Sequence, residues 1–269
     1  MTRLAVIGAG VMGEALVSGL LRAGWSSDAI VVADRRDFRR AEMTAAHGVR
    51  ATGNAEAAAE ADTVILVVKP QDVGAVLPEI APVLRPGTLV VSLCAGVTTA
   101  QLEGHLPEGT AVVRVMPNTP ALVGEGMAAV SAGTTASEAD VAHAMELMTA
   151  LGKAITVPEA YQDAVTAISG SGPAYLFFVV EAMIDAGVLL GLPRDISSTL
   201  VQQTVFGSAK LLVESGQHPT VLREQVTSPG GTTAAALRQL EDHKVKAAFL
   251  TAMEAAGRID PEIIAKYFE

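Results

Sequence analysis

The chain has 269 residues, half of them hydrophobic, and its 19 Lys and Arg against 29 Asp and Glu give a net charge of −10. This length favours two domains, and the acidic balance argues against nucleic acid as a partner. The single cysteine, Cys94, excludes an internal disulfide, and the five histidines show no spacing typical of a metal site, so we expect no metal.

Short β-branched runs alternate with amphipathic segments in the N-terminal half. We predict buried strands at Leu4–Ile7, Ile30–Ala33, Thr63–Val68, Leu89–Ser92 and Val112–Val115. Polar residues predict where helices between the strands begin: Asn54 as a cap, Thr98 with Gln101 as a capping box, and Ser137. The alternation is the βαβ pattern, so we expect an α/β Rossmann domain with a mostly parallel, doubly wound sheet.

A glycine-rich motif, Gly8-Ala9-Gly10-Val11-Met12-Gly13, lies between the first strand and the first helix. In this context Gly8 permits a tight turn, Gly10 lets a pyrophosphate approach the backbone, and Gly13 lets the helix pack closely on the strand. The motif therefore predicts that these six residues bind a dinucleotide.

The second strand ends in Asp34-Arg35-Arg36, and all three are candidate cofactor contacts. An acid here accepts hydrogen bonds from the ribose of NAD, whereas an arginine just beyond it holds the 2′-phosphate of NADP. The two arginines followed by Asp37 are equally typical of a solvated helix start. We expect NADPH as the cofactor and leave NADH open.

Three further loops follow the carboxyl ends of strands, where open α/β sheets bind their ligands. We predict cofactor contacts at Val68, Lys69, Pro70, Ala95, Gly96 and Asn118. A surface lysine at Lys69 and a plain turn around Asn118 remain as alternatives. For Cys94, burial as a small apolar side chain is favoured over a redox role.

Beyond Val157 the strand pattern ends and helical periodicity takes over. We predict helices at Tyr161–Leu190, Ser197–Val213, Thr233–Leu240 and Val245–Ile259. The domains are thus expected to be residues 1–157, which bind the dinucleotide, and residues 158–269, which are helical. The apolar helix 174–190 suits a core or a subunit interface. Because Glu181 interrupts its most apolar stretch, we expect no membrane span. The N-terminus shows no signal-peptide pattern, which predicts a cytoplasmic protein.

The segment Ser228-Pro229-Gly230-Gly231-Thr232-Thr233 has the composition of a small-anion cradle. The two glycines allow backbone amides to point inward, and the three hydroxyls add donors. Thr232 or Thr233 is expected to cap a helix starting at Ala234, whose dipole favours a bound carboxylate. An ordinary capped turn is the alternative.

These motifs together resemble the pyrroline-5-carboxylate reductase family, over essentially the whole chain. The resemblance is carried by 7–13, 68–70, 95–97, 116–120, 168–175 and 228–233, of which the last two in this order are highly specific. It implies a Rossmann domain followed by an all-α domain that dimerises by interlocking helices, often within a decamer. It also implies NAD(P)H-dependent reduction of the C=N bond of 1-pyrroline-5-carboxylate to L-proline, the last step of proline biosynthesis.

Some residue roles are carried over from the family. The resemblance implies that Ser228–Thr233 binds the substrate carboxylate, that Thr233 lies near the ring nitrogen as the catalytic candidate, and that Asn54 contacts the adenosine end of the cofactor. Some members place a glutamate where this chain has Gly216, so that role is not transferred. For residues 168–175, helix packing and catalysis both remain open.

The residues fit three other functions less well. A β-hydroxyacid dehydrogenase requires a lysine on the first interdomain helix, and none follows Gly172 in residues 173–178. A different cyclic imine reductase would leave the 228–233 loop without a carboxylate to bind. A non-catalytic NAD(P)-binding sensor would need no second anion site.

Overall fold

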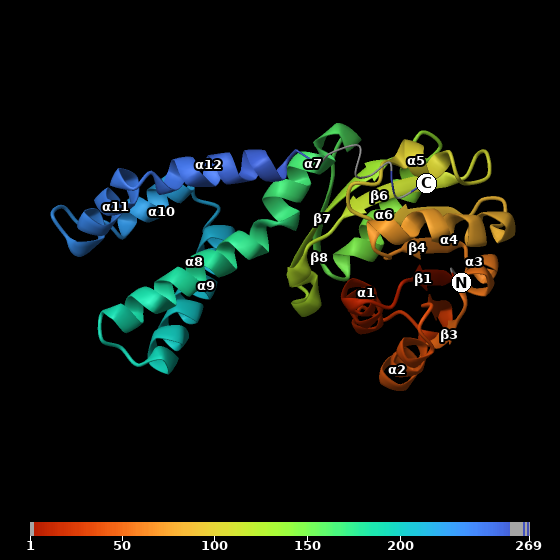
Figure 1. Ribbon diagram of the computed structural model, residues 1–269, viewed down its shortest axis with the longest axis horizontal. Helices are drawn as coiled ribbons and strands as arrows, with labels where there is room; N and C mark the ends of the chain where they lie inside the picture. The colour runs from red at the N-terminus through yellow and green to blue at the C-terminus, as the bar shows by residue number, and fades with distance from the viewer. Residues whose placement is uncertain (1–2, 259–265, 267, 269) are drawn as a thin grey trace. The chain divides into compact units, whose positions relative to one another are not determined.

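The computed structural model describes residues 3–258, 266 and 268, and it consists of two compact units (Figure 1). Among the described residues, the first unit contains the chain up to Ser171, and the second is Gly172–Ala255. The units therefore divide later than the expected boundary after Val157.

Contacts explain this later division. The segment after the last strand stays with the first unit because Glu159 accepts hydrogen bonds from the amide and hydroxyl of Thr99, at 2.8 and 2.6 Å. Gln162, fully buried, donates to the Ser131 hydroxyl at 2.8 Å. The last strand does end at Thr156, so the expected boundary coincides with the end of the sheet and not with the division into compact units.

Within the described residues the first unit holds an eight-stranded sheet in the order β3-β2-β1-β4-β5-β6-β7-β8. The strands are β1 Leu4–Ile7, β2 Ile30–Ala33, β3 Arg50–Thr52, β4 Thr63–Leu66, β5 Leu89–Ser92, β6 Ala111–Met116, β7 Gly126–Ala132 and β8 Gly152–Thr156. All neighbours pair in parallel except β6 and β7. The expected Rossmann class is confirmed, with β3, β7 and β8 added to the predicted strands.

Helices cover both faces of this sheet (Figure 1). They are α1 Val11–Arg22, α2 Asp37–His47, α3 Asn54–Glu60, α4 Val73–Ile80, α5 Thr99–Glu103, α6 Glu138–Thr149 and α7 Gln162–Val165, with short turns η1 Ser27–Ala29, η2 Pro70–Asp72, η3 Ala81–Val83, η4 Thr119–Val123, η5 Glu159–Tyr161 and the π-helical η6 Thr166–Gly170. Strand β1 is buried throughout, and its residues alternate between the two core clusters, Leu4 and Val6 in one, Ala5 and Ile7 in the other.

The predicted helix starts are mostly confirmed. Thr98 with Gln101 and Ser137 with Asp140 both form capping boxes. Asn54 is not a cap: Gly53 is the N-cap of α3, and Asn54 is its first helical residue. The Asn54 side chain instead donates to a carboxylate of another helix, as described below.

Every element described in the second unit is a helix. The helices are α8 Gly172–Leu189, α9 Arg194–Ser215, α10 Pro219–Gln225, α11 Thr232–Asp242 and α12 Val245–Ala256. The helices predicted at Ser197–Val213 and Thr233–Leu240 are confirmed within α9 and α11, and α10 is added. The segment predicted as one helix at Tyr161–Leu190 is divided into α7, η6 and α8, and the helix predicted at Val245–Ile259 is confirmed to Ala256, while Ile259 lies outside the described residues. Helices α8 and α9 approach closely because Gly187 has no side chain, since a Cβ there would lie 2.1 Å from the Ser197 Oγ. That hydroxyl donates to the Ile184 carbonyl at 2.8 Å.

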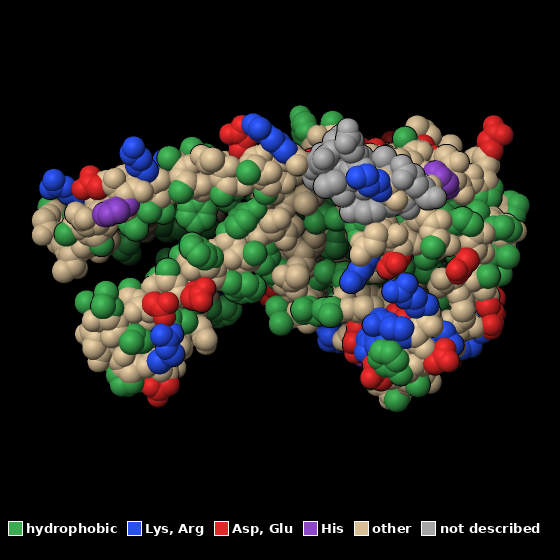
Figure 2. Space-filling model, viewed as in Figure 1, with side chains coloured by type: hydrophobic (Ala, Val, Ile, Leu, Met, Phe, Trp, Pro, Cys, Tyr) green, Lys and Arg blue, Asp and Glu red, His purple; other side chains and the backbone are tan. Residues whose placement is uncertain are grey.

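The surface of the second unit is strongly apolar, as the hydrophobic side chains over its helices in Figure 2 show. On α8, Phe177 is 65% exposed and Phe178 73%. One described helical run, Glu159–Leu189, is long and apolar enough to cross a membrane by length and composition, and its most apolar window is not buried. Glu181 lies inside this run, so its carboxylate does not keep the helix from meeting the length and composition of a span, and the expected absence of a membrane span stays a prediction.

Candidate dinucleotide site and substrate loop

The glycine-rich loop has the geometry that a pyrophosphate requires. Gly8 has φ +112°, and a Cβ there would lie 2.7 Å from the Val67 carbonyl oxygen, while one on Gly13 would lie 1.9 Å from the Gly8 oxygen. A Cβ on Gly10 would meet nothing within 4 Å. The backbone at Gly10 is therefore open to a ligand, next to the first amides of α1, which lack partners within the helix. These features fit a dinucleotide phosphate.

A cavity of about 300 Å³ opens beside this loop. Among its lining residues are eight of the predicted cofactor contacts: Gly8, Gly10, Asp34, Arg35, Arg36, Asn54, Val68 and Lys69. The structure therefore brings together four segments that are far apart in the sequence, around residues 8–10, 34–36, 54 and 68–69. The other predicted contacts lie outside the lining and stay predictions: Ala9, Val11, Met12, Gly13, Pro70, Ala95, Gly96 and Asn118.

One wall of the cavity was not predicted. It consists of Val67, Asp72, Ala75, Val76 and Glu79, most of them on α4 or the turn before it. Ala75 and Glu79 are four residues apart and so share one face of the helix. That spacing, directly after the strand ending at Leu66, is the signal in the sequence that could have identified this wall.

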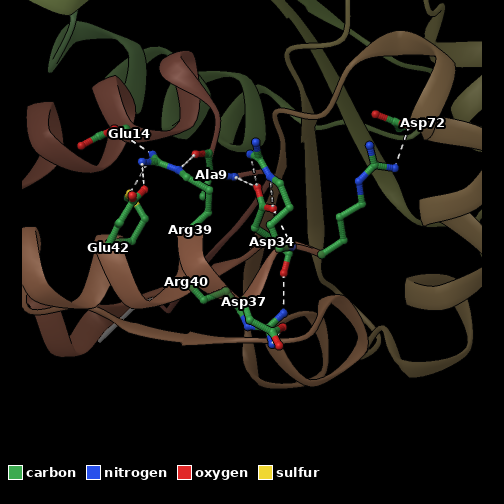
Figure 3. A network of polar contacts seen from close by, with 11 residues as sticks. Ala9, Glu14, Asp34, Asp37, Arg39, Arg40, Glu42 and Asp72 are labelled. Carbon is green, nitrogen blue, oxygen red and sulfur yellow. Dashed lines mark hydrogen bonds and ion pairs between the residues drawn. The ribbon is translucent and has the colours of Figure 1, made fainter.

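The Asp34 carboxylate is saturated with donors from its own chain (Figure 3). Its Oδ1 accepts from the backbone amide and the Nε of Arg36, both at 2.9 Å, and its Oδ2 accepts from the Ala9 amide and the Arg36 Nη2, both at 3.0 Å. Burial alone would raise the pKa of Asp34, but these bonds outweigh it and lower the pKa from 3.8 to about 2. A carboxylate has about four acceptor positions, and here all are filled.

This pKa predicts a pH dependence of stability. The folded pKa of Asp34 lies below the ordinary value of 3.8, so its contribution is complete well above that value and is lost as the pH falls toward 2. We expect Asp34 to contribute about 1 kcal/mol less at pH 3 than at pH 6, after allowing for solvent screening. Urea unfolding at both pH values should show the gap between wild type and Asp34→Asn narrowing by this amount. A gap that does not change with pH would contradict it.

Two polar pairs line the cavity. The Asn54 Nδ2 donates to the Glu79 carboxylate at 2.7 Å, which joins α3 to α4 at the end where the adenosine is predicted to bind. Arg35, with a side chain 79% exposed, lies 3.5 Å from Asp72.

The nearby Cys94 is 2% exposed, and burial raises the pKa of its thiol to about 11, which confirms the predicted apolar role.

Asn118 is held by the first unit itself. Its Oδ1 accepts from the Met127 amide at 2.9 Å, and its Nδ2 donates to the Ser169 carbonyl at 3.2 Å. A Cβ on Gly170 would lie 2.5 Å from the Met116 Cε. These contacts favour the packing interpretation of residues 168–171. A contact between Asn118 and a cofactor stays a prediction.

The 228–233 loop, described within the second unit alone, forms a tight turn before α11. Gly230 has φ +69°, and the Gly231 amide donates to the Ser228 carbonyl at 3.0 Å. The expected helix start was wrong: α11 begins at Thr232 with Gly231 as its N-cap, so Thr232 and Thr233 lie in its first turn. A glycine N-cap leaves the hydroxyls free, and within residues 3–258 those of Ser228, Thr232 and Thr233 make no hydrogen bond.

Gly216, to which no substrate role was transferred, has a structural role. It ends α9 in the left-handed conformation with φ +61°, which a residue with a side chain rarely adopts. Among the described residues no group of three or more His, Cys, Asp or Glu is placed to hold a metal ion.

Comparison with known proteins covers both units. A family described as pyrroline-5-carboxylate reductase dimerisation matches residues 159–262, and one described as NADP oxidoreductase, coenzyme F420-dependent, matches residues 3–96. A pyrroline-5-carboxylate reductase of Corynebacterium melassecola is 43% identical over 267 residues, which cover 98% of this chain and 99% of that protein.

Solved structures agree with this. The pyrroline-5-carboxylate reductase of Coxiella burnetii superposes with a TM-score of 0.91 at 35% identity, covering 100% of this chain and 99% of that one. The Plasmodium falciparum pyrroline carboxylate reductase, solved with NADP bound, gives 0.85 at 32% identity, covering 100% and 98%. Because a relative that is 43% identical covers 98% of the chain, and a solved reductase that is 35% identical superposes over all of it, this chain belongs to the pyrroline-5-carboxylate reductase family.

Proposed function

We propose that this chain reduces the C=N bond of 1-pyrroline-5-carboxylate with NAD(P)H to give L-proline, in the last step of proline biosynthesis. The observation that carries the proposal is the 43% identity to a named reductase over 98% of the chain, which spans both units. The test is the initial rate of NAD(P)H oxidation with 1-pyrroline-5-carboxylate, with NADPH and NADH in parallel. A folded protein that binds NADPH but reduces no pyrroline-5-carboxylate would overturn it, leaving another cyclic imine or a sensor.

The cofactor, when bound, supplies the hydride that reduces the imine carbon. Residues of the chain would hold it as follows: the amides at the start of α1 on the pyrophosphate, Asn54 toward the adenosine, and Arg36 on a 2′-phosphate. We propose NADPH as the preferred cofactor because the Asp34 carboxylate has no acceptor position left for a ribose hydroxyl. Lys69 adds a further cation to the lining.

The substrate is proposed to bind at residues 228–233. Its carboxylate would be held by backbone amides of the loop, by the Ser228 hydroxyl and by the dipole of α11, which has 11 residues. Reduction also requires a proton on the imine nitrogen, and a protonated iminium is the better hydride acceptor. We assign to the Thr233 hydroxyl a hydrogen bond to that nitrogen, or to a water that protonates it.

Replacing Thr233 by Ala is expected to lower kcat by about 10- to 100-fold, because one hydrogen bond to a charged group is worth roughly 1.5–3 kcal/mol. Steady-state kinetics at saturating substrate and cofactor would measure it. Thr251→Ala is the matched control, since the Thr251 hydroxyl only donates to the Ala247 carbonyl of its own helix, at 3.1 Å. An unchanged kcat in folded Thr233→Ala would remove Thr233 from the mechanism.

The apolar surface of the second unit is proposed to be covered by a second copy of the chain in a homodimer, which we expect to assemble further into a decamer. The dimerisation family matches residues 159–262, the region where Phe177 and Phe178 are exposed. A protein partner fits this surface better than lipid because Glu181 and Asp185 lie within the same helical run, and carboxylates are costly in a bilayer. Sedimentation of the detergent-free protein tests whether it is a dimer or a larger assembly.

We propose that the protein is located in the cytoplasm, because its cysteine is a buried free thiol.

A further inference from the structure

Both polar backbone groups of Ala9, in the middle of the glycine-rich loop, bond to other parts of the chain. The Ala9 amide donates to the Asp34 Oδ2 at 3.0 Å, and the Ala9 carbonyl accepts from the Arg39 Nε at 2.9 Å. Ala9 itself is fully buried and does not line the cavity. The two peptide groups that flank Ala9 are therefore both held, the Gly8–Ala9 group by Asp34 at the end of β2 and the Ala9–Gly10 group by Arg39 of α2. Glycines on either side would otherwise leave it free to rotate.

The Arg39 side chain is itself fixed in place (Figure 3). Its Nη2 donates to Glu14 on α1 at 2.8 Å, and its Nη1 donates to Glu42 on α2 at 2.6 Å. The side chain is only 17% exposed. The two carboxylates aim the planar guanidinium, so its third edge, Nε, is directed at the Ala9 carbonyl.

The same contacts neutralise a charge near the expected phosphate. Glu14 lies in the first turn of α1, the end where an anion is predicted to bind, and its carboxylate also lies 3.2 Å from the His47 Nε2. Bonds from Arg39 and then His47 lower the pKa of Glu14, so it stays ionised. An ionised Glu14 without Arg39 would repel a pyrophosphate, whereas the ion pair cancels most of that repulsion.

The geometry points to Arg39 as a positioning residue for the cofactor. Arg39 and Asp34 together fix the backbone on both sides of Ala9, so that the amides that follow, at the start of α1, face the pyrophosphate. The inference rests on the proposed use of a dinucleotide. Arg39 does not line the cavity, so it acts through the loop and not by touching the ligand. Asp34 contributes both to the glycine-rich loop and to the 2′-phosphate site. It accepts a hydrogen bond from the Ala9 amide, and it also holds Arg36, the residue proposed to bind the 2′-phosphate.

Two variants separate the contacts of Arg39. Arg39→Lys keeps the charge between Glu14 and Glu42 but loses the fork that carries the Nε donor, whereas Arg39→Met removes every donor. Arg50→Lys is the matched control, since Arg50 also pairs with two glutamates, Glu56 and Glu60, and among the described residues its side chain bonds to these two and not to the loop. Calorimetry on the cofactor-free protein measures the Kd of NADPH and of adenosine 2′-monophosphate, which has no pyrophosphate and so does not need the loop.

The expected result is a Kd for NADPH about 10-fold weaker in Arg39→Lys and weaker still in Arg39→Met. The Kd for adenosine 2′-monophosphate should stay within about twofold of wild type, and Arg50→Lys should match wild type for both probes. Amide hydrogen exchange in the peptide covering residues 8–12 should rise in both Arg39 variants. At saturating NADPH, kcat should be nearly unchanged while KM for NADPH rises.

Two results would overturn the inference. One is a folded Arg39→Met that binds NADPH as tightly as wild type, and the other is an equal loss for both probes, which would mean general damage to the site. Failure of the proposed function is distinguishable, because wild-type protein would then bind NADPH without reducing the imine, or would not bind NADPH at all.

Discussion

Replacing Arg36 by Gln is expected to lower kcat/KM with NADPH about 100-fold, because it removes the two charge-assisted hydrogen bonds that we propose Arg36 makes to the 2′-phosphate. With NADH, kcat/KM should stay within about threefold of wild type or rise, since that cofactor has no 2′-phosphate. Initial rates with both cofactors give the ratio of the two kcat/KM values. This ratio, and not the absolute rate, is the quantity that the substitution should change.

The expectation follows from how Arg36 is held. Its Nε and Nη2 form a bidentate pair with Asp34, and its Cζ lies 5.5 Å from the centre of the Phe38 ring. A guanidinium fixed at one edge and over one face loses little entropy when its remaining edge binds a phosphate. In Arg36→Gln the Asp34 carboxylate regains free acceptor positions, which suit the ribose hydroxyls of NADH and repel a 2′-phosphate.

Arg35→Gln is the graded comparison for this experiment. Arg35 also lines the cavity, but its side chain is 79% exposed and its pair with Asp72, at 3.5 Å, is long. Replacing Arg35 should lower kcat/KM with NADPH by no more than about fivefold, because exposed charges contribute little. Equal losses for NADPH and NADH in Arg36→Gln would show that Arg36 does not read the 2′-phosphate.

The sequence predicted the strands whose residues are apolar on both faces, such as β1 and β5, because continuous buried runs are the signal of a parallel sheet. It missed β7 and β8, where alanine, glycine and single polar residues give no periodicity and where pairing with β6 and with each other decides the conformation. It also missed α10, whose seven residues are too few to show a period.

At the cavity, the sequence predicted eight of the lining residues but neither their hydrogen-bond partners nor the wall formed by α4 and the turn before it. The segment Asp34-Arg35-Arg36 was equally consistent with an acceptor for the ribose, a binding site for the 2′-phosphate and a solvated helix start. The hydrogen bond that helps to occupy the Asp34 carboxylate comes from the Ala9 amide, 25 residues away, and a contact at that separation leaves no local pattern in the sequence. The contact between Asn54 and Glu79 has the same separation. The position of α11 was missed by two residues since glycine, like threonine, serves as an N-cap.

The glycines of the loop should separate cofactor binding from folding. Gly10→Ala is expected to keep the free energy of unfolding within about 0.5 kcal/mol of wild type, because Gly10 has φ −73°, which alanine adopts, and its Cβ would meet nothing within 4 Å. The same methyl group would occupy the approach of the pyrophosphate to the backbone, so the Kd of NADPH should weaken by about 100-fold or more. Urea unfolding and calorimetry measure the two quantities.

Gly13→Ala, in contrast to Gly10→Ala, should lower the free energy of unfolding. Its Cβ would lie 1.9 Å from the Gly8 carbonyl oxygen, a backbone atom that cannot rotate away. Overpacking of this severity costs about 3 kcal/mol, and the better helix propensity of alanine returns about 1 kcal/mol, so the protein should lose about 2 kcal/mol. Because α1 must move off the loop, NADPH binding weakens as well. Destabilisation by Gly10→Ala, or a Gly13→Ala protein as stable as wild type, would contradict the roles assigned to the two glycines.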